Sequence, residues 1–276
     1  MLSAKLPQLQ QVVAIADRAS ALAMAMLQAP WQSHTKEDNS PVTAIDLAID
    51  RFLRRELRAL MPAAAWLSEE TADRPDRLQC SYVWVVDPID GTRSLIAGRP
   101  EFCVSIALVQ SGVGPLLGVI ANPSTGERFL AEHGSGARNQ NGKVLKVKDY
   151  DATSPALLVS RTDKRTGLWD GVAPDGWMTK MGGLAYKMGL VAAGAYDGHA
   201  TPTPRSEWDA AAGVLIVQQA GGISTDVHGR PLRFNQPRPH FDGFVVASQM
   251  AHAPLLQLVQ GSVTRWHAVQ TRAPIR

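Results

Sequence analysis

The sequence predicts an α+β layered architecture in two subdomains that meet near residues 148–155. Two amphipathic helical segments open the chain, and a set of short β-like runs separated by Gly and Pro follows them. Beyond residue 155, strand-like and helix-like segments alternate. Because this order groups helices and strands before it alternates them, it favours an α+β fold. With 276 residues and 45% hydrophobic residues, the chain can form a large core or two packed subdomains.

The N-terminal helices are predicted from the spacing of apolar residues. Residues 9–27 and residues 43–60 both place apolar side chains three and four positions apart. Pro30 ends the first segment and Pro62 ends the second. Each segment therefore presents one apolar face to a core.

Four β-like runs come next. Residues 82–86 read Tyr-Val-Trp-Val-Val, a nearly continuous apolar run that is typical of a buried strand. Residues 102–109, 115–121 and 127–132 are further β-like runs with Gly and Asn-Pro between them, which predicts an antiparallel meander.

The C-terminal half is predicted as alternating elements. It comprises a strand at 156–160, helices at 185–193 and 206–220, a strand at 244–247, a short helix at 252–259 and a frayed basic tail at 265–276. We expect an N-terminal subdomain over residues 1–150, with most of the candidate metal ligands, and a C-terminal subdomain over residues 151–276.

Composition excludes several classes of protein. The net charge is only +3 and the Lys and Arg residues are scattered, so a nucleic-acid polymer is not an expected partner. No apolar run reaches the ~18 residues of a membrane span, and the N-terminus does not resemble a secretory signal. Cys80 and Cys103 are too few for a disulfide framework and are expected in the core. A soluble cytoplasmic protein is predicted.

Asp-Pro-Ile-Asp-Gly-Thr at residues 87–92 is the most informative motif. A carboxylate at the end of a buried strand is unfavourable unless it is paired or binds a cation. Asp87 and Asp90 can point at one place, and Gly91 lets backbone approach a ligand closely. A helix that opens at Gly91-Thr92 would direct its free N–H groups at a phosphate. Oxygen ligands without His or thiolate select Mg²⁺ or Mn²⁺.

Each acidic signal also has a structural explanation. The motif at residues 87–92 is a plausible turn, and Asp46 and Asp209 match the third position of helix capping boxes. Glu69 and Glu70 alone would be typical of a solvated loop. These alternatives remain open when each motif is taken singly.

Taken together, the motifs resemble the inositol monophosphatase superfamily of metal-dependent phosphatases. The matching blocks occur in the family's order at residues 40–46, 68–70, 84–92, 208–213 and 220–222. The resemblance spans about residues 10–250 and implies a layered α-β-α-β-α sandwich of the sugar-phosphatase type. It also implies lithium sensitivity, a homodimer and a small soluble phosphate ester as substrate.

The resemblance implies a role for each matching residue. Glu69, Asp87 and the Ile89 carbonyl would hold one Mg²⁺, and Asp87, Asp90 and Asp209 a second, with a weaker third ion reached partly through Glu69. The ions would number two to three, and Mn²⁺ would substitute for Mg²⁺. Asp46 and Thr92 would orient the attacking water, with Glu69 contributing to catalysis through the third ion. The Gly91 and Thr92 N–H groups would bind the phosphate.

Three details favour the 3'(2'),5'-bisphosphate nucleotidase branch, which hydrolyses 3'-phosphoadenosine 5'-phosphate. Residues 36–43, Ser68 and the segment 158–161 are similar to that branch. Residues 93–95 and the Gly-Gly start of the segment 182–187 depart from its usual pattern. An inositol-1-monophosphatase or a related sugar or histidinol phosphatase is therefore the alternative.

Substrate contacts are expected from Gly183, in the segment that resembles the family's leaving-group loop, and from the basic residues Lys187 and Arg205. Ordinary surface charge is the alternative for both basic residues. A non-catalytic metal- or phosphate-binding scaffold is the alternative to an enzyme.

Overall fold

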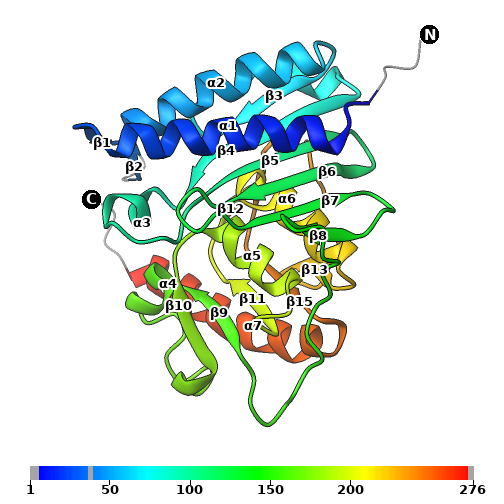
Figure 1. Ribbon diagram of the computed structural model, residues 1–276. Coiled ribbons are helices and arrows are strands. Elements are labelled where there is room, and N and C mark those ends of the chain that lie inside the picture. Colours follow the sequence, from blue (N-terminus) through cyan, green and yellow to red (C-terminus); the bar gives the residue numbers. More distant parts are fainter. Residues whose placement is uncertain (1–5, 37–39, 273–276) are drawn as a thin grey trace.

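The computed structural model describes residues 6–36 and 40–272, which form five layers in the order α-β-α-β-α (Figure 1). Helices α1 and α2 cover one face of a six-stranded sheet, and α5 and α6 pack between that sheet and a five-stranded sheet. Helix α7 covers the outer face of the second sheet. The predicted α+β layered fold is confirmed.

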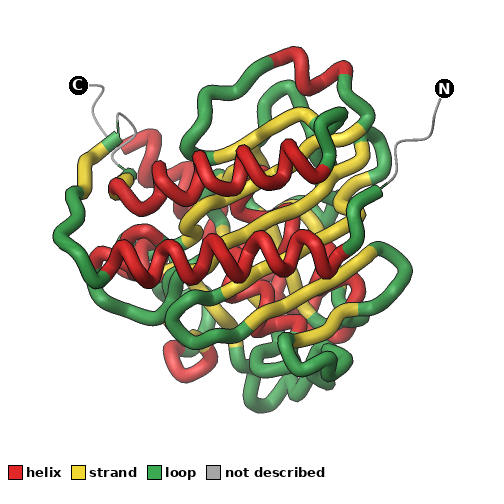
Figure 2. Tube along the Cα trace, turned by 45° about the horizontal axis from the view of Figure 1, so that its top comes forward, coloured by secondary structure: helices red, strands yellow, loops and turns green. Residues whose placement is uncertain are grey.

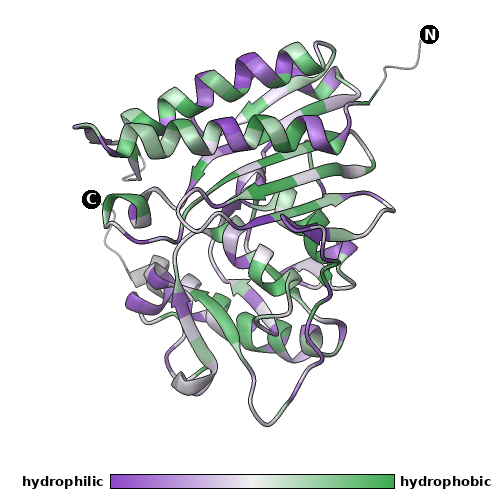
Figure 3. Ribbon diagram, in the orientation of Figure 1, coloured by the Kyte–Doolittle hydropathy of each residue, from purple (hydrophilic) through white to green (hydrophobic). Residues whose placement is uncertain are grey.

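The first layer consists of α1 (Leu9–Leu27) and α2 (Ala44–Leu60), as their spacing predicts. Figure 2 shows the two helices side by side across the strands, and Figure 3 shows hydrophilic and hydrophobic residues alternating along them. The apolar side chains Ile49 and Leu53 of α2 are fully buried against the sheet, in one cluster with Trp84. Burial of this face stabilises the layer.

The six-stranded sheet has the strand order β3-β4-β5-β6-β7-β8. Its strands are β3 (Ala65–Ser68), β4 (Tyr82–Asp90), β5 (Cys103–Gln110), β6 (Gly114–Ala121), β7 (Arg128–Glu132) and β8 (Ala137–Asn139). All neighbours from β4 to β8 pair antiparallel, which confirms the meander, and β3 pairs parallel with β4 at the edge. Strand β4 is longer than predicted, because Asp90 still pairs with Cys103 of β5. Asp87 and Asp90 therefore belong to the strand and do not follow it.

The middle helices are α5 (Leu184–Ala192) and α6 (Glu207–Gln219). The second sheet has the order β10-β9-β11-β15-β13 and is formed by β9 (Leu157–Ser160), β10 (Met178–Met181), β11 (Gly198–Thr201), β13 (Ile223–Asp226) and β15 (Phe244–Ala247). Short elements complete the described residues: β1 (Ser33–Thr35), β2 (Pro41–Thr43), β12 (Arg205–Ser206), β14 (His240–Phe241), α3 (Thr92–Ile96), α4 (Arg161–Arg165) and the 3₁₀ helices Pro75–Gln79 and Asp175–Trp177.

The last helix, α7, runs over Gln249–Arg272 and corrects two predictions. The expected short helix at 252–259 is too short, and the tail expected to fray is helical through Arg272. Apolar residues recur along α7 as far as Val263 and Trp266, which pack against the outer cluster and extend the helix. Residues 273–276 lie outside the described residues. Within the described part of the chain, no helix has the length and apolar character that crossing a bilayer requires.

Candidate functional site

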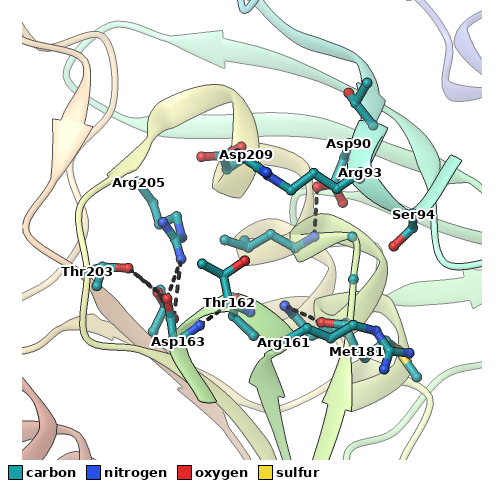
Figure 4. A pocket seen from close by; sticks show the side chains of 18 of the residues that line it. Asp90, Arg93, Ser94, Arg161, Thr162, Asp163, Met181, Thr203, Arg205 and Asp209 are labelled. Atoms are coloured by element: carbon teal, nitrogen blue, oxygen red, sulfur yellow. Dashed lines mark hydrogen bonds and ion pairs between the residues drawn. The ribbon is translucent and has the colours of Figure 1, made fainter. Parts of the chain in front are cut away.

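A cavity of about 1190 Å³ lies between the two halves of the chain. Its lining residues include members of β4, α3, α4, α5, β11, β12 and α6 (Figure 4). Asp90 and Asp209 lie on one side of the cavity, whereas Arg205, Asp163 and Arg161 lie on the other (Figure 4). The side with Asp90 and Asp209, which we call the acidic wall, also carries Arg93, and the other side holds Arg205, Arg161 and Asp163 (Figure 4).

The acidic wall is built around Asp87, Asp90 and Asp209. One carboxylate oxygen from each lies within 4.8 Å of the others, although β4 supplies two of them and α6 the third. Such a set of hard oxygen donors is suited to Mg²⁺. Three carboxylates this close repel one another without a cation, so the donor set fits a metal ion.

A β-bulge in β4 brings Asp87 and Asp90 to one side of the sheet. In a regular strand, residues three apart point to opposite faces. Here Asp87 pairs with Ser105 and Asp90 with Cys103, so β4 carries one extra residue between the two pairs. The extra residue reverses the alternation, and Ile89 accordingly packs against the α1–α2 side.

The N-terminus of α5 holds Asp90 in place. The Leu184 N–H donates to Asp90 Oδ1 at 2.7 Å, and the Ala185 N–H donates to Asp90 Oδ2 at 2.7 Å. The Tyr186 N–H and the buried Cys103 thiol also donate to Oδ2, at 3.3 and 3.4 Å. Free N–H groups at a helix start are favourable partners for an anion.

Burial raises the pKa of every carboxyl group in the cluster, and repulsion by neighbouring carboxylates adds to the rise for Asp87 and Asp209. Burial is the largest cause for each group, and the charge of Glu69 is the next for Asp87 and for Asp209. The pKa of Asp209 rises to about 7, and those of Asp87 and Asp90 are raised as well. A bound cation would reverse these shifts by stabilising the ionised forms.

Asp46 and Thr92 form the pair that the resemblance implies. The Thr92 hydroxyl donates to Asp46 Oδ1 at 2.8 Å and lies 3.1 Å from the Ile89 carbonyl oxygen. Asp46 Oδ2 accepts the Thr43 N–H at 2.9 Å, and the Thr43 hydroxyl accepts from the first turn of α2. Asp46 therefore closes a capping box and contacts Thr92 at the same time.

Glu69 lines the cavity from the turn after β3. Lys36 Nζ lies 2.9 Å from Glu69 Oε1 and 2.7 Å from Glu70 Oε1. Burial is the largest cause of the raised pKa of Glu69. The negative charges of Asp46 and Asp90 raise this pKa further. The positive charge of Lys36 thus offsets the negative charge of Glu69 and Glu70 on this side of the cluster.

Gly91 and Gly183 meet between α3 and α5. Their φ angles are 96° and 59°, which favour glycine. A Cβ atom on Gly91 would lie 2.6 Å from the Glu101 carbonyl oxygen and 3.1 Å from Gly183 Cα. Both positions need glycine because the two backbones approach closely beside Asp90.

The predicted basic contacts line the same cavity, and Lys187 lies near enough to Asp90 for the Asp90 charge to act on it. Lys187 Nζ lies 3.4 Å from the Met181 carbonyl oxygen, and burial lowers the pKa of Lys187 to about 8. Arg205 donates to both carboxylate oxygens of Asp163, at 3.2 and 3.3 Å. The structure thus places Lys187, Arg205 and Gly183 at the same cavity as the acidic cluster.

Sequence reasoning missed several polar residues of this cavity. Asp163 accepts hydrogen bonds from Arg205 and Thr201, and Glu101 forms an ion pair with Arg161 while accepting the Gly182 N–H at 2.8 Å. These contacts join segments that are far apart in sequence, so no local sequence motif predicts them. The sequence contains no separate sign of the Lys36 contact with Glu69, because Lys36 stood out only as the first residue of the block at residues 36–43. Residues 37–39 of that block lie outside the described residues.

Comparison with known proteins identifies the family. The model of the inositol monophosphatase family matches residues 7–264. The 3'(2'),5'-bisphosphate nucleotidase CysQ of Aggregatibacter actinomycetemcomitans is 33% identical over 83% of this chain and 87% of its own length. A histidinol-phosphatase of Chlorobaculum parvum is 34% identical over 81% of this chain and 87% of its own. The structure of the Thermotoga maritima IMPase is similar with a TM-score of 0.82 and 25% identity, covering 93% of this chain and 98% of that one. The chain therefore belongs to the inositol monophosphatase family, a family of phosphatases.

Proposed function

We propose that this protein is a Mg²⁺-dependent phosphomonoesterase that hydrolyses 3'-phosphoadenosine 5'-phosphate to AMP and phosphate. The observation that carries the proposal is the carboxylate cluster of Asp87, Asp90 and Asp209, which lines one cavity with Thr92, whose hydroxyl donates to Asp46. A phosphate monoester is a dianion, so its hydrolysis requires groups that neutralise charge and a means of activating water.

The proposed ligands are Glu69, Asp87, the Ile89 carbonyl, Asp90 and Asp209, for two to three Mg²⁺ ions that Mn²⁺ can replace. When bound, Mg²⁺ neutralises charge on the phosphate and lowers the pKa of a bound water. Lithium sensitivity is expected with this ligand set as a property of the family.

The Asp46–Thr92 pair is proposed to orient the attacking water and accept its proton. The Thr92 hydroxyl already donates to Asp46, so its oxygen is free to accept from water. The water proton passes to Thr92 Oγ1 as the Thr92 proton passes to Asp46. The N–H groups of Gly91 and Thr92 are proposed to bind the phosphate beside this pair.

The second phosphate of the substrate is proposed to contact Lys187 and Arg205. Both line the cavity that the carboxylate cluster also lines, and both side chains carry groups that can donate to a phosphate. The similarity to CysQ supports a bisphosphate nucleotide, and the similarities to a histidinol-phosphatase and to IMPase support the alternative of a single-phosphate substrate. A homodimer in the cytoplasm remains the prediction for the working form.

A substrate panel tests this proposal. Phosphate release is measured with Mg²⁺ from 3'-phosphoadenosine 5'-phosphate, inositol 1-phosphate, histidinol phosphate and fructose 1,6-bisphosphate. We expect the highest kcat/KM with 3'-phosphoadenosine 5'-phosphate, and a Lys187→Met variant should lose more with that substrate than with inositol 1-phosphate. Preference for a single-phosphate ester would support the alternative phosphatase. Mg²⁺ binding without release from any ester would identify a non-catalytic scaffold.

A further inference from the structure

A polar bridge with a buried centre connects the segment after Glu69 with the start of α6. Its members are Asp73, Arg77, Asn235, Gln236 and Glu207, and we call it the Arg77 bridge. Arg77 and Glu207 are 1% and 0% exposed. Charged side chains are rarely buried this completely unless their hydrogen bonds are satisfied.

Arg77 forms the first half of the bridge. Its Nε and Nη2 donate to the two carboxylate oxygens of Asp73 at 2.6 and 2.9 Å. Its Nη1 donates to Asn235 Oδ1 at 2.6 Å, and Nη2 also donates to the Gln236 carbonyl oxygen at 2.8 Å. Arg77 therefore fixes the loop at residues 235–236 against the 3₁₀ helix Pro75–Gln79.

Glu207 forms the second half. Its Oε2 accepts the Asn235 N–H at 2.7 Å, and its Oε1 accepts the Gln236 N–H at 2.8 Å. The Glu207 N–H in turn donates to the Pro239 carbonyl oxygen at 2.9 Å. Both carboxylate oxygens are thus used to hold one loop, so the first turn of α6 has a fixed position relative to that loop.

The same turn of α6 carries Asp209. Its Oδ2 accepts the Ser206 N–H at 2.9 Å, which orients the carboxylate on the turn that Glu207 anchors. Asp209 is the member of the carboxylate cluster that comes from the C-terminal half, whereas Asp87 and Asp90 come from β4. The distance from Asp209 to Asp87 and Asp90 therefore depends on how α6 is held against the N-terminal half.

We infer that Glu207 is a positioning residue for the metal centre: through the Arg77 bridge it sets the place of Asp209 relative to Asp87 and Asp90. The inference rests on the proposed function, since it assumes that this cluster binds Mg²⁺. Groups that orient metal ligands change metal affinity by ~10–100-fold when they are replaced.

The variant Glu207→Gln tests the inference. The amide keeps the size of the side chain, but its NH₂ group must face the N–H of Asn235 or Gln236, and one hydrogen bond is lost. We expect the dissociation constant for Mn²⁺, measured by paramagnetic resonance without substrate, to rise about tenfold. Mg²⁺ is then titrated against Mn²⁺ in the same experiment, and its apparent constant should rise by the same factor.

Asp226→Asn is the matched control. Asp226 also accepts two backbone N–H groups, from His228 at 2.8 Å and Arg230 at 2.9 Å, and also pairs with the Arg230 side chain at 2.7 Å. It lies at the end of β13, apart from the described residues that line the cavity. This variant should lower the midpoint of thermal unfolding and leave the Mn²⁺ dissociation constant within about twofold of the unaltered protein.

A second variant covers the case in which Glu207→Gln does not fold. Asn235 has a φ of 57°, which Gly adopts readily, so Asn235→Gly keeps the backbone N–H to Glu207 and removes the acceptor for Arg77. A rise in the Mn²⁺ dissociation constant is expected here too. Unchanged Mn²⁺ affinity in the variants that fold, beside loss of thermal stability, would make the bridge purely structural and overturn the inference. If the unaltered protein binds neither Mn²⁺ nor Mg²⁺, the proposed function fails and the inference with it.

Discussion

Asp46 and Asp209 occupy equivalent places at the third position of their helices, α2 and α6. Each accepts the backbone N–H of the N-cap residue, Thr43 for Asp46 and Ser206 for Asp209. Each also takes part in the proposed site: Asp46 accepts a hydrogen bond from Thr92, and Asp209 belongs to the carboxylate cluster. The structural and functional explanations of these residues are therefore compatible, because one carboxylate has two oxygens and several lone pairs.

The hydroxyl of Thr92 should decide the rate. Thr92→Val removes the group that donates to Asp46, and kcat is expected to fall by ~10²-fold or more. Thr92→Ser keeps the hydroxyl and should retain most of the rate. Steady-state kinetics on both variants, with circular dichroism to verify folding, measures this. Equal rates for the Val and Ser variants would contradict a role for the hydroxyl.

Asp209→Asn should separate metal binding from folding. The pKa of Asp209 is raised by burial and by the charges of Glu69 and Asp90, so a neutral amide relieves repulsion in the metal-free protein. The amide oxygen can still accept the Ser206 N–H. We expect the metal-free melting temperature to be no lower than that of the unaltered protein, and the gain on adding Mg²⁺ to be lost.

Thermal unfolding with EDTA and with Mg²⁺ tests the Asp209 prediction, and Asp151→Asn serves as an exposed control. A full Mg²⁺-induced gain in Asp209→Asn would exclude Asp209 as a ligand.

At the scale of elements, the bulge in β4 determines whether the acidic motif can work as a unit. Without the extra residue, Asp87 and Asp90 would face opposite sides of the sheet. The N-terminus of α5 then holds Asp90 from the other side, through the N–H groups of Leu184 and Ala185. A strand irregularity and a helix start from different halves of the chain thus build one site.

The α2 layer is expected to contribute to stability only through its buried face. Leu53 is 0% exposed against the sheet, whereas Leu47 on the same helix is 36% exposed. Leu53→Ala should lower the free energy of unfolding by about 2–5 kcal/mol, since it leaves a cavity in the core. Leu47→Ala should change it by less than ~0.5 kcal/mol. Denaturant unfolding of both variants checks this, and equal losses would contradict the layer assignment.

For the whole molecule, the cluster links stability to pH and to Mg²⁺. In the metal-free folded protein the pKa of Asp209 is about 7, above the ordinary aspartate value of 3.8, and the pKa values of Asp87 and Asp90 are raised as well. Between pH 3.8 and about 7, the folded chain therefore binds more protons than the unfolded chain. The free energy of unfolding of the metal-free protein falls as pH rises through this range.

Mg²⁺ should counteract that loss, because it stabilises the ionised carboxylates. The increase in melting temperature that Mg²⁺ produces is expected to grow as pH is raised from about 4 to about 7. Melting curves recorded across this range, with EDTA and with saturating Mg²⁺, measure the difference. A Mg²⁺ effect that stays constant across the range would show that these carboxylates do not bind the ion.

Periodicity and turn residues in the sequence predict the helices at residues 9–27 and 43–60, the antiparallel meander and the α+β class, because these signals act locally, and the second helix begins one residue later than predicted. The sequence by itself also determined which acidic residues to consider, since motifs in a family's order can be read without coordinates. The division of the chain near residue 150 and the roles of the site residues remain predictions.

The lengths of β4 and α7 and the distant groups that support the cluster depend on tertiary contacts. Strand β4 continues through Asp90 because β5 pairs with it, and α7 continues beyond residue 259 because Val263 and Trp266 pack against the sheet. The Arg77 bridge joins residues up to 159 positions apart, and such contacts leave no periodic signal. Local interactions fix the elements, whereas the position of Asp209 beside Asp87 and Asp90 depends on packing between layers that only the folded chain brings together.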